Sequence, residues 1–308
     1  MKQSTATYLI ILIFLSAGLF IKNPFILNMV SLSALTVITV MGLNLLLGYA
    51  GQVSLGHAGF VAMGAYISSI LSIKTGLNPW LSIAIASIIT TVVAAFIGYP
   101  TLKLKGHYLA MATLAIGEII YMLANNLISL TGGHQGLTGI PMLSIGSFTF
   151  DSERKFYFFS WAVVLIFAFI SHRIINSHYG RALKAIHEKE AAAKSFGVNV
   201  HLYKVAIFSL SAFYAAISGG LYAFYIGFIS PSSFSLLKSI DYIVMAFVGG
   251  IDSIFGSIIT TVILGSLPNI LTSLQDFWPI VNGGLLVLAA MFMTRGVGGL
   301  IRWKRNTF

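Results

Sequence analysis

The chain has 308 residues and a net charge of +10, and 57% of its residues are hydrophobic while only 8% are charged. Soluble domains carry about 25% charged residues, so this composition excludes a soluble globular domain and predicts a multi-pass membrane protein. The positive charge does not require a nucleic acid as partner, because Lys and Arg also gather on the cytoplasmic loops of membrane proteins.

Apolar segments follow one another along the whole chain. Many approach the ~20 residues that cross a bilayer core as a helix, and lipid tolerates only backbone that satisfies its own hydrogen bonds. We therefore predict an all-α, polytopic transmembrane helical bundle with about ten spans, forming a single transmembrane domain over 1–308. The predicted spans are 7–22, 26–47, 55–73, 79–99, 107–130, 156–175, 204–228, 236–249, 254–272 and 279–294.

The stretch "GYAGQVSLGHAGF" (48–60) interrupts this pattern with four glycines and three polar side chains. Polar groups in a membrane segment need partners or water, and unwound backbone survives there only against protein or a water-filled cavity. We expect the break of a discontinuous helix that lines a translocation pathway. Its predicted residues are Asn44, Gln52, Ser54 and His57, with Gly51 and Gly56 allowing close helix packing. The alternative is a glycine-rich turn at the inner surface with solvated polar side chains.

Glu118 lies near the middle of the predicted span 107–130. A charge at the bilayer centre costs roughly 2.5–3.5 kcal/mol on insertion scales, so this carboxyl should face the interior of the bundle. We add Glu118 to the predicted pathway residues. A structural partner, such as His57 or a tyrosine, is an equally good interpretation.

Two loops are long enough to have a function. Residues 131–155 are glycine-rich and polar, and residues 176–203 have the pattern of an amphipathic helix or two short ones, with Leu183, Ile186, Ala193 and Phe196 on one face. Within the second loop, Glu190 and Lys194 form an i,i+4 pair, and Gly197 is placed to end the helix. A surface helix that merely joins two spans is the alternative.

The basic residues predict which loop lies inside. With ten spans and both termini cytoplasmic, thirteen of the 18 Lys and Arg residues lie inside, which agrees with the positive-inside rule. Loop 131–155 is then external and loop 176–203 cytoplasmic. The five basic residues on the outer side are Lys22, Lys74, Arg154, Lys155 and Lys238.

Small residues recur every four positions in "FSLSAFYAAISGGLYAF" (208–224), with Ala212, Ala216 and Gly220 forming one such row. Such rows let transmembrane helices approach closely, because van der Waals contact drives helix association in lipid. This segment is therefore predicted to be a central, tightly packed helix.

Motifs of catalysis are missing from the sequence. It contains no G-x-x-x-x-G-K-[ST] phosphate loop, no H-E-x-x-H zinc motif and no G-x-S-x-G nucleophile elbow, and it has no cysteine for disulfides or thiolate metal sites. We expect no catalytic residue, no metal site and no cofactor. An intramembrane enzyme therefore has little support.

Several separate segments carry a family resemblance, in matching order. They are "GLNLLLGYAGQVSLGHAGFVAMGAY" (42–66), "LKGHYLAMATLAIGEII" (104–120), "SLTGGHQGLTGIP" (129–141), "YGRALKAIHEKEAAAKSFGVNVHLYKVAIFSLSAF" (179–213) and "GFISPSSFSLLKSIDYIVMAFVGGIDSIFGSII" (227–259). Through these the chain resembles the permease subunits of high-affinity branched-chain amino-acid ABC importers of the LivM type.

The resemblance implies a membrane-spanning permease domain that is not itself an enzyme, in the bacterial cytoplasmic (inner) membrane. Its implied partners are two cytoplasmic ABC ATPase subunits, a second homologous permease in a heterodimer, an extracytoplasmic solute-binding protein and the lipid bilayer, without nucleic acid. The implied solute is leucine, isoleucine or valine.

The resemblance also implies a coupling helix that docks on the ATPase, here "EAAAKSFG" (190–197). It departs from the pattern of many importers, since four residues rather than three separate Ala192 from Gly197. The implied coupling residues are Arg181, Ala182, Glu190, Ala191, Ala192 and Gly197.

Two other functions stay open from the sequence. Permeases for urea or short amides share most of these motifs. A self-sufficient secondary transporter or channel would also explain Glu118 and the broken helix.

Overall fold

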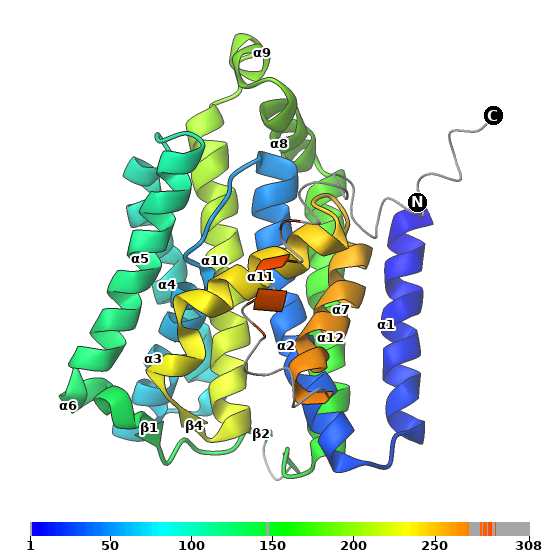
Figure 1. Cartoon of the computed structure of the whole chain (residues 1–308), viewed down its shortest axis with the longest axis vertical. Helices are drawn as coiled ribbons and strands as arrows, with labels where there is room; N and C mark the ends of the chain where they lie inside the picture. Colours follow the sequence, from blue (N-terminus) through cyan, green and yellow to red (C-terminus); the bar gives the residue numbers. More distant parts are fainter. Residues whose placement is uncertain are drawn as a thin grey trace. The chain divides into compact units, whose positions relative to one another are not determined.

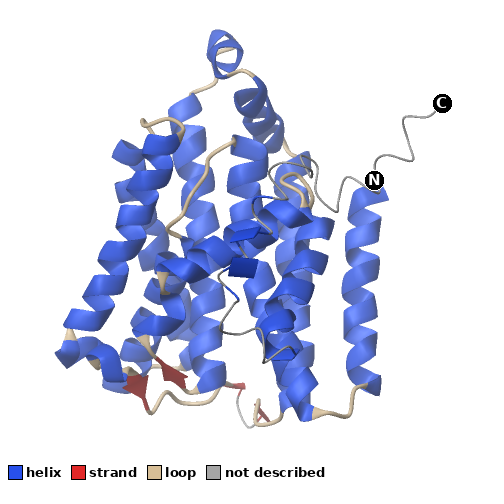
Figure 2. Ribbon diagram, in the orientation of Figure 1, coloured by secondary structure: helices blue, strands red, loops and turns tan. Residues whose placement is uncertain are grey.

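The structure is a computed structural model that describes residues 2–145 and 148–270, with isolated positions beyond them. Its described part is almost entirely helical (Figures 1 and 2). The helices are α1 (Lys2–Phe20), α2 (Pro24–Asn44), α3 (His57–Thr75), α4 (Pro79–Thr101), α5 (His107–Asn126), α6 (Ile128–Thr131), α7 (Glu153–Asn176), α8 (His178–Glu188), α9 (Glu190–Ser195), α10 (Val200–Ile226), α11 (Leu236–Gly249) and α12 (Ile254–Ile270).

Short elements join these helices. A π-helical turn, η1 (Leu45–Tyr49), continues α2, and η2 (Gly133–Gln135) and η3 (Pro231–Phe234) are 3-10 turns. The strands are two residues each: β1 (Leu137–Thr138), β2 (Ser144–Ile145), β3 (Phe148–Thr149) and β4 (Phe228–Ile229). The prediction of an all-α, multi-pass membrane protein is therefore confirmed.

Seven helical segments of the described residues are long and apolar enough to cross a membrane, and Thr5–Phe20 and Ile254–Ile270 are shorter apolar helices. The predicted span 107–130 is too long, because α5 ends at Asn126 and a separate turn, α6, follows. The predicted tenth span, 279–294, lies outside the continuously described residues. The seven segments are Pro24–Tyr49, His57–Thr75, Pro79–Thr101, His107–Asn126, Glu153–Asn176, Val200–Ile226 and Pro231–Gly249.

Local sequence explains where several spans begin and end. Asn23 and Asn78 each accept a hydrogen bond from a backbone N–H of the following first turn, which starts with a proline. Proline suits this position because its missing N–H would have no helical partner there. Gly76 and Gly227 end α3 and α10 with positive φ angles of 67° and 73°, a conformation that costs glycine little.

The chain forms two compact units that are interleaved in sequence. The first comprises 1–49, 152–181 and 241–308, and the second comprises 50–151 and 182–240. In the first unit α2 packs against α7 and α12, and α1 packs against α7. In the second unit α10 packs against α3 and α4, and α5 contacts α3. A single permease domain over 1–308 stays a prediction.

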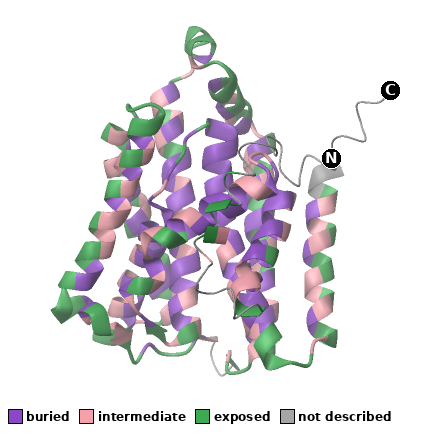
Figure 3. Ribbon diagram, in the orientation of Figure 1, coloured by how far each residue is buried: buried purple, intermediate pink, exposed green. Residues whose placement is uncertain are grey.

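Helix α10 is the central element of the second unit, and most of its residues are buried (Figure 3). A β-carbon added at Gly219 would lie 2.0 Å from the carbonyl oxygen of Val61 in α3. Likewise, a β-carbon added at Gly64 of α3 would lie 2.1 Å from the carbonyl oxygen of Ala216. The two helices thus touch backbone to backbone through small residues. Ala212 and Gly220 are also buried on α10.

The two long loops lie at opposite ends of α10. Strand β1, from loop 131–155, pairs antiparallel with β4, which follows the C-terminal end of α10, with Leu137 opposite Ile229. The helices α8 and α9 of loop 176–203 precede its N-terminal end. Because α10 is long enough to span a bilayer, the arrangement agrees with one external and one cytoplasmic loop.

Candidate functional site

Residues 51–56 are not helical and separate η1 from α3. This segment begins beside α8, since a β-carbon added at Gly51 would lie 3.3 Å from Cδ2 of His187. Gly51 has a φ of 65° and is exposed. Gly51 therefore forms a turn next to His187 of α8. This role differs from the close helix contact that was expected for Gly51. The reason is the positive φ, which glycine adopts readily and other residues avoid.

The polar side chains of this segment are buried and hydrogen-bonded within the second unit. His57 is wholly buried, and its Nδ1 lies 3.0 Å from Ser54 Oγ while its Nε2 lies 2.5 Å from Ser211 Oγ in α10. Gln52 is also buried and donates from Nε2 to the carbonyl oxygen of Ala50 at 2.8 Å. These side chains are not solvated, so the inner-surface turn with polar groups in water does not describe them.

Side chains of neighbouring elements accept hydrogen bonds from the backbone N–H groups where α3 begins. The N–H of Leu55 donates to Oγ1 of Thr113 in α5 at 3.0 Å, and the N–H of Ala58 donates to Oγ of Ser239 at 3.0 Å. A β-carbon added at Gly56 would lie 2.2 Å from the carbonyl oxygen of Thr113. The helix break is thus enclosed by protein, as a break at membrane depth must be.

Asn44 belongs to the first unit, whereas Gln52, Ser54, His57 and Glu118 belong to the second. Asn44 is wholly buried, and its Nδ2 donates to the carbonyl oxygen of Gly250 and to Oγ of Ser257, each at 2.8 Å. A β-carbon added at Gly48 would lie 1.5 Å from the carbonyl oxygen of Ile251. Asn44 and the close approach at Gly48 fix the end of α2 against the turn between α11 and α12.

Glu118 is half-buried on α5, and within the described part of the chain its carboxylate has no hydrogen bond or ion pair. His57 is not its partner, because both ring nitrogens of His57 contact serines. Glu118 shares a stripe of α5 with three exposed residues, Met111, Ala115 and Met122. The opposite face of α5, with Ile116 and Ile120, lines an apolar cavity of about 530 Å³ against α3 and α4.

Loop 176–203 folds into two short helices, α8 and α9. Leu183, Ile186 and Ala193 are buried as predicted, and Val200 joins the last two in a small apolar core. Phe196 is instead 87% exposed, so its predicted place on the apolar face is wrong. The helix stops and restarts at Lys189, which has an extended backbone, and this restart breaks the periodicity on which that prediction depended.

The predicted coupling residues are spread over this loop. Arg181 belongs to the first unit and is exposed, and its guanidinium Nη2 lies 2.6 Å from Nδ1 of His178. Ala191 and Ala192 are also exposed, while Ala182 is half-buried. Gly197 has a φ of 78°, and its N–H donates to the carbonyl oxygen of Lys194 at 2.9 Å. Helix α9 thus ends where the glycine was predicted to end it.

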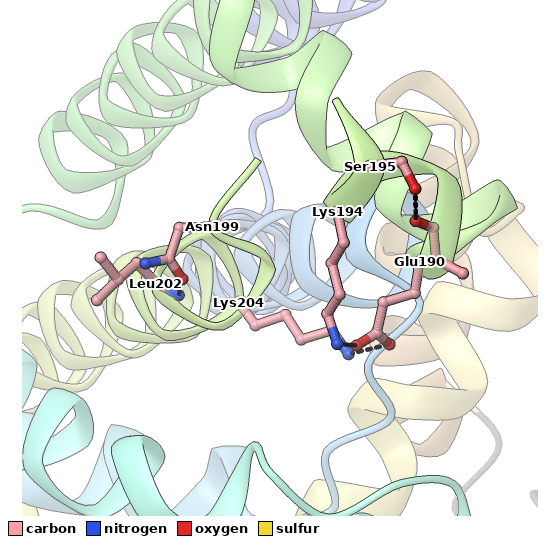
Figure 4. Close-up of polar contacts among 7 residues, drawn as sticks. Glu190, Lys194, Ser195, Asn199, Leu202 and Lys204 are labelled. Carbon is pink, nitrogen blue, oxygen red and sulfur yellow. Dashed lines mark hydrogen bonds and ion pairs between the residues drawn. The ribbon is translucent and has the colours of Figure 1, made fainter. Parts of the chain in front are cut away.

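Glu190 connects α9 to α10 by an ion pair (Figure 4). Its carboxylate accepts from Nζ of Lys204 at 2.9 Å and from Nζ of Lys194 at 3.2 Å. The hydrogen bond from Lys204 is the main cause that lowers the pKa of Glu190; burial opposes it and Lys194 adds to it. No motif or periodicity in the sequence marks Lys204, although a lysine just inside an apolar span needs a partner.

Within the described residues, no three His, Asp or Glu side chains lie close enough together to hold a metal ion. The candidate site consists of helix contacts, buried hydrogen bonds and the ion-pair cluster of Glu190. Such an arrangement positions helices and offers surfaces to partners.

Comparison with known proteins shows the family. A family model described as "Branched-chain amino acid transport system / permease component" matches residues 25–293. The permease LivM of Escherichia coli is 29% identical over 88% of this chain and 69% of its own length. A probable LivM of Methanocaldococcus jannaschii is 28% identical over 61% of this chain and 64% of its own length.

A relative with another solute in its name also matches. The nucleoside ABC transporter permease NupC of Lactococcus lactis is 23% identical over 56% of this chain and 59% of its own length. The family model covers far more than half of the chain. The chain therefore belongs to the family of branched-chain amino acid transport system permease components and is a non-catalytic, membrane-spanning permease subunit of an ABC importer.

Proposed function

We propose that this chain forms part of the translocation route of an ATP-driven importer for leucine, isoleucine and valine. The observation that carries the proposal is the family match over residues 25–293, together with the similarity to E. coli LivM over most of the chain. The chain contributes the translocation route and the conformational change that opens it, whereas ATP hydrolysis belongs to separate subunits.

The stripe of α5 that contains Glu118 is the proposed wall of the route. A carboxylate within a membrane-spanning helix is too costly to face lipid, and Glu118 has no partner among the described side chains. An aqueous route shared with a second homologous permease would hydrate it. We assign Gln52, Ser54 and His57 to holding the walls of this route within the second unit, because their contacts are intramolecular. Asn44 makes contacts of the same kind within the first unit.

The surface formed by α8 and α9 is the proposed docking site for an ATPase subunit. Phe196 projects from the end of α9 and is exposed, beside a hollow of about 450 Å³ lined in part by Ala185 and Ala192. Exposed aromatic side chains commonly anchor protein interfaces. We place this surface in the cytoplasm, with both termini, and the loop 131–155 on the outer side, where a solute-binding protein would dock.

Reconstitution tests the proposal. The permease, co-expressed with two ATPases, its partner permease and a binding protein, is placed in proteoliposomes and supplied with leucine. We expect uptake that requires ATP and the binding protein, and no uptake by this chain alone. Flux driven by an ion gradient through the isolated chain would instead establish a self-sufficient transporter.

The solute needs its own test, because the similarity to NupC shows that related permeases serve other solutes. The same vesicles are offered leucine, urea, a short amide and a nucleoside, each with the cognate binding protein. Uptake of leucine but none of the others is expected. Preference for urea or an amide would select the alternative within the same family.

A further inference from the structure

We infer that the Glu190–Lys204 ion pair is a strut that locks α9 onto α10, so that α10 carries movement of the docking surface to the buried break before α3. The inference rests on the proposed function, because it takes α8 and α9 as the surface that the ATPase moves. It assigns a positioning role in coupling to two residues whose side chains need not touch the ATPase or the solute.

The geometry of the ion pair favours a mechanical role (Figure 4). Glu190 is the first residue of α9 and Lys204 lies in the second turn of α10, and their charged atoms are 2.9 Å apart. The side chain of Lys204 is only 7% exposed and that of Glu190 is 30% exposed. A buried ammonium strongly opposes loss of the carboxylate that pairs with it, so this contact resists separation of the two helices.

Without the strut, α9 would have a hinge. Gly197 connects α9 to α10 with a positive φ of 78°, and nothing lies within 4 Å of the place where its β-carbon would be. Asn199 caps α10 by accepting from the N–H of Leu202 at 3.3 Å, so α10 begins rigidly just after the glycine. The ion pair bridges this turn, helped by the apolar contact of Ala193 with Val200.

Helix α10 continues from the strut through the second unit, to which Glu190 and Lys204 also belong. Ser211 lies seven residues beyond Lys204, about 10 Å along the axis at 1.5 Å per residue, and contacts His57 at the start of α3. Farther along, Gly219 touches the backbone of α3. A displacement of α9 would therefore be transmitted to the segment 51–56 and to α3, because close-packed contacts transmit strain.

Lys194 provides a matched control within the same cluster. It donates to the same carboxylate at 3.2 Å, but it is 61% exposed and belongs to α9 itself. Removing its charge leaves the link between α9 and α10 intact. A strut therefore requires Lys204 and not Lys194.

The experiment measures solute imported per ATP hydrolysed by the complete importer in proteoliposomes. The variants are Glu190→Gln, Lys204→Gln, Lys194→Gln and the exchanged pair Glu190→Lys with Lys204→Glu. Because uptake is measured per ATP hydrolysed, a change in the amount of ATPase bound by Glu190→Gln or Lys204→Gln does not enter the ratio. Their uptake per ATP should fall by roughly 2- to 30-fold, the range corresponding to 0.5–2 kcal/mol of coupling.

Lys194→Gln should behave as the unaltered chain, and the exchanged pair should recover most of the lost uptake. Equal uptake per ATP in Glu190→Gln and Lys194→Gln overturns the strut, as does an exchanged pair that inserts but stays uncoupled. If Lys204→Gln does not accumulate in the membrane, Glu190→Gln decides, because Glu190 is more exposed than Lys204. Failure of the unaltered chain to bind an ATPase is a separate result, and it overturns the proposed function.

Discussion

His57 and Ser211 are 154 positions apart in sequence, yet Nε2 of His57 lies 2.5 Å from Oγ of Ser211. This contact joins the first residue of α3 to the middle of α10, both wholly buried. Nδ1 of the same imidazole lies 3.0 Å from Ser54 Oγ. One side chain thus holds together the end of the helix break and the central helix of the second unit.

Ser211→Ala should destabilise the permease by about 1–3 kcal/mol, because a buried ring nitrogen of His57 loses its partner. Ser209→Ala is the matched control, since the hydrogen bond of Ser209 goes to the carbonyl oxygen of Val205 in its own helix. The midpoint of chemical denaturation in detergent measures both. Equal midpoints for the two variants would show that the His57 contact adds nothing.

Gly219→Ala should reduce the amount of folded permease and its stability by about 1–3 kcal/mol or more, the usual range for an overfilled contact. The added methyl would lie 2.0 Å from the Val61 carbonyl oxygen, so α3 and α10 would have to separate. Ala84→Leu, on an exposed position of α4, is a larger change that should be tolerated. Size-exclusion profiles and thermal unfolding compare the two, and a normal profile for Gly219→Ala would contradict the close contact.

Glu118 allows a test of the proposed route, because the chain has no native cysteine. In the assembled importer, Glu118→Cys should react with a membrane-impermeant thiol reagent. Ile116→Cys, on the cavity face of α5, should not. In addition, Glu118→Leu should change stability by less than about 1 kcal/mol. A gain of roughly 2.5–3.5 kcal/mol, together with no labelling, would place Glu118 against lipid.

Phe196→Ala should weaken retention of the ATPase by about 2 kcal/mol, roughly 30-fold, if this exposed ring anchors the interface. The stability of the isolated permease should not change, because Phe196 is 87% exposed. Phe96→Ala is the control, since Phe96 is 81% exposed on the membrane-spanning helix α4. Pull-down of the ATPase at several concentrations gives both affinities, and equal losses would remove the special role of Phe196.

The Glu190 ion pair predicts a defined pH dependence. Lys204 lowers the pKa of Glu190 in the folded chain, so the stabilisation is complete above the ordinary pKa of 4.5 and is lost as the pH falls through the lowered value. The difference in unfolding midpoint between the unaltered chain and Glu190→Gln should therefore stay constant from about pH 8 to pH 5. It should shrink only in stronger acid, and a difference that vanishes near neutral pH would contradict the ion pair.

Patterns within single segments predicted much of this fold. The apolar runs identified most of the spans, and Gly197 marked the end of α9. The glycines and polar residues at 48–60 indicated a broken helix, and residues 51–56 are not helical. These features depend on neighbours only a few residues away, since caps, turns and helical periodicity are local.

Tertiary structure alone decided which side chains meet. The partners of His57, the link between Glu190 and Lys204 and the exposure of Phe196 have no periodic signature, because each depends on how separate helices pack or on where one helix restarts. The sequence shows that a polar residue lies in an apolar segment, and such a residue needs a partner. The identity of that partner follows from close contacts between helices that are distant in sequence.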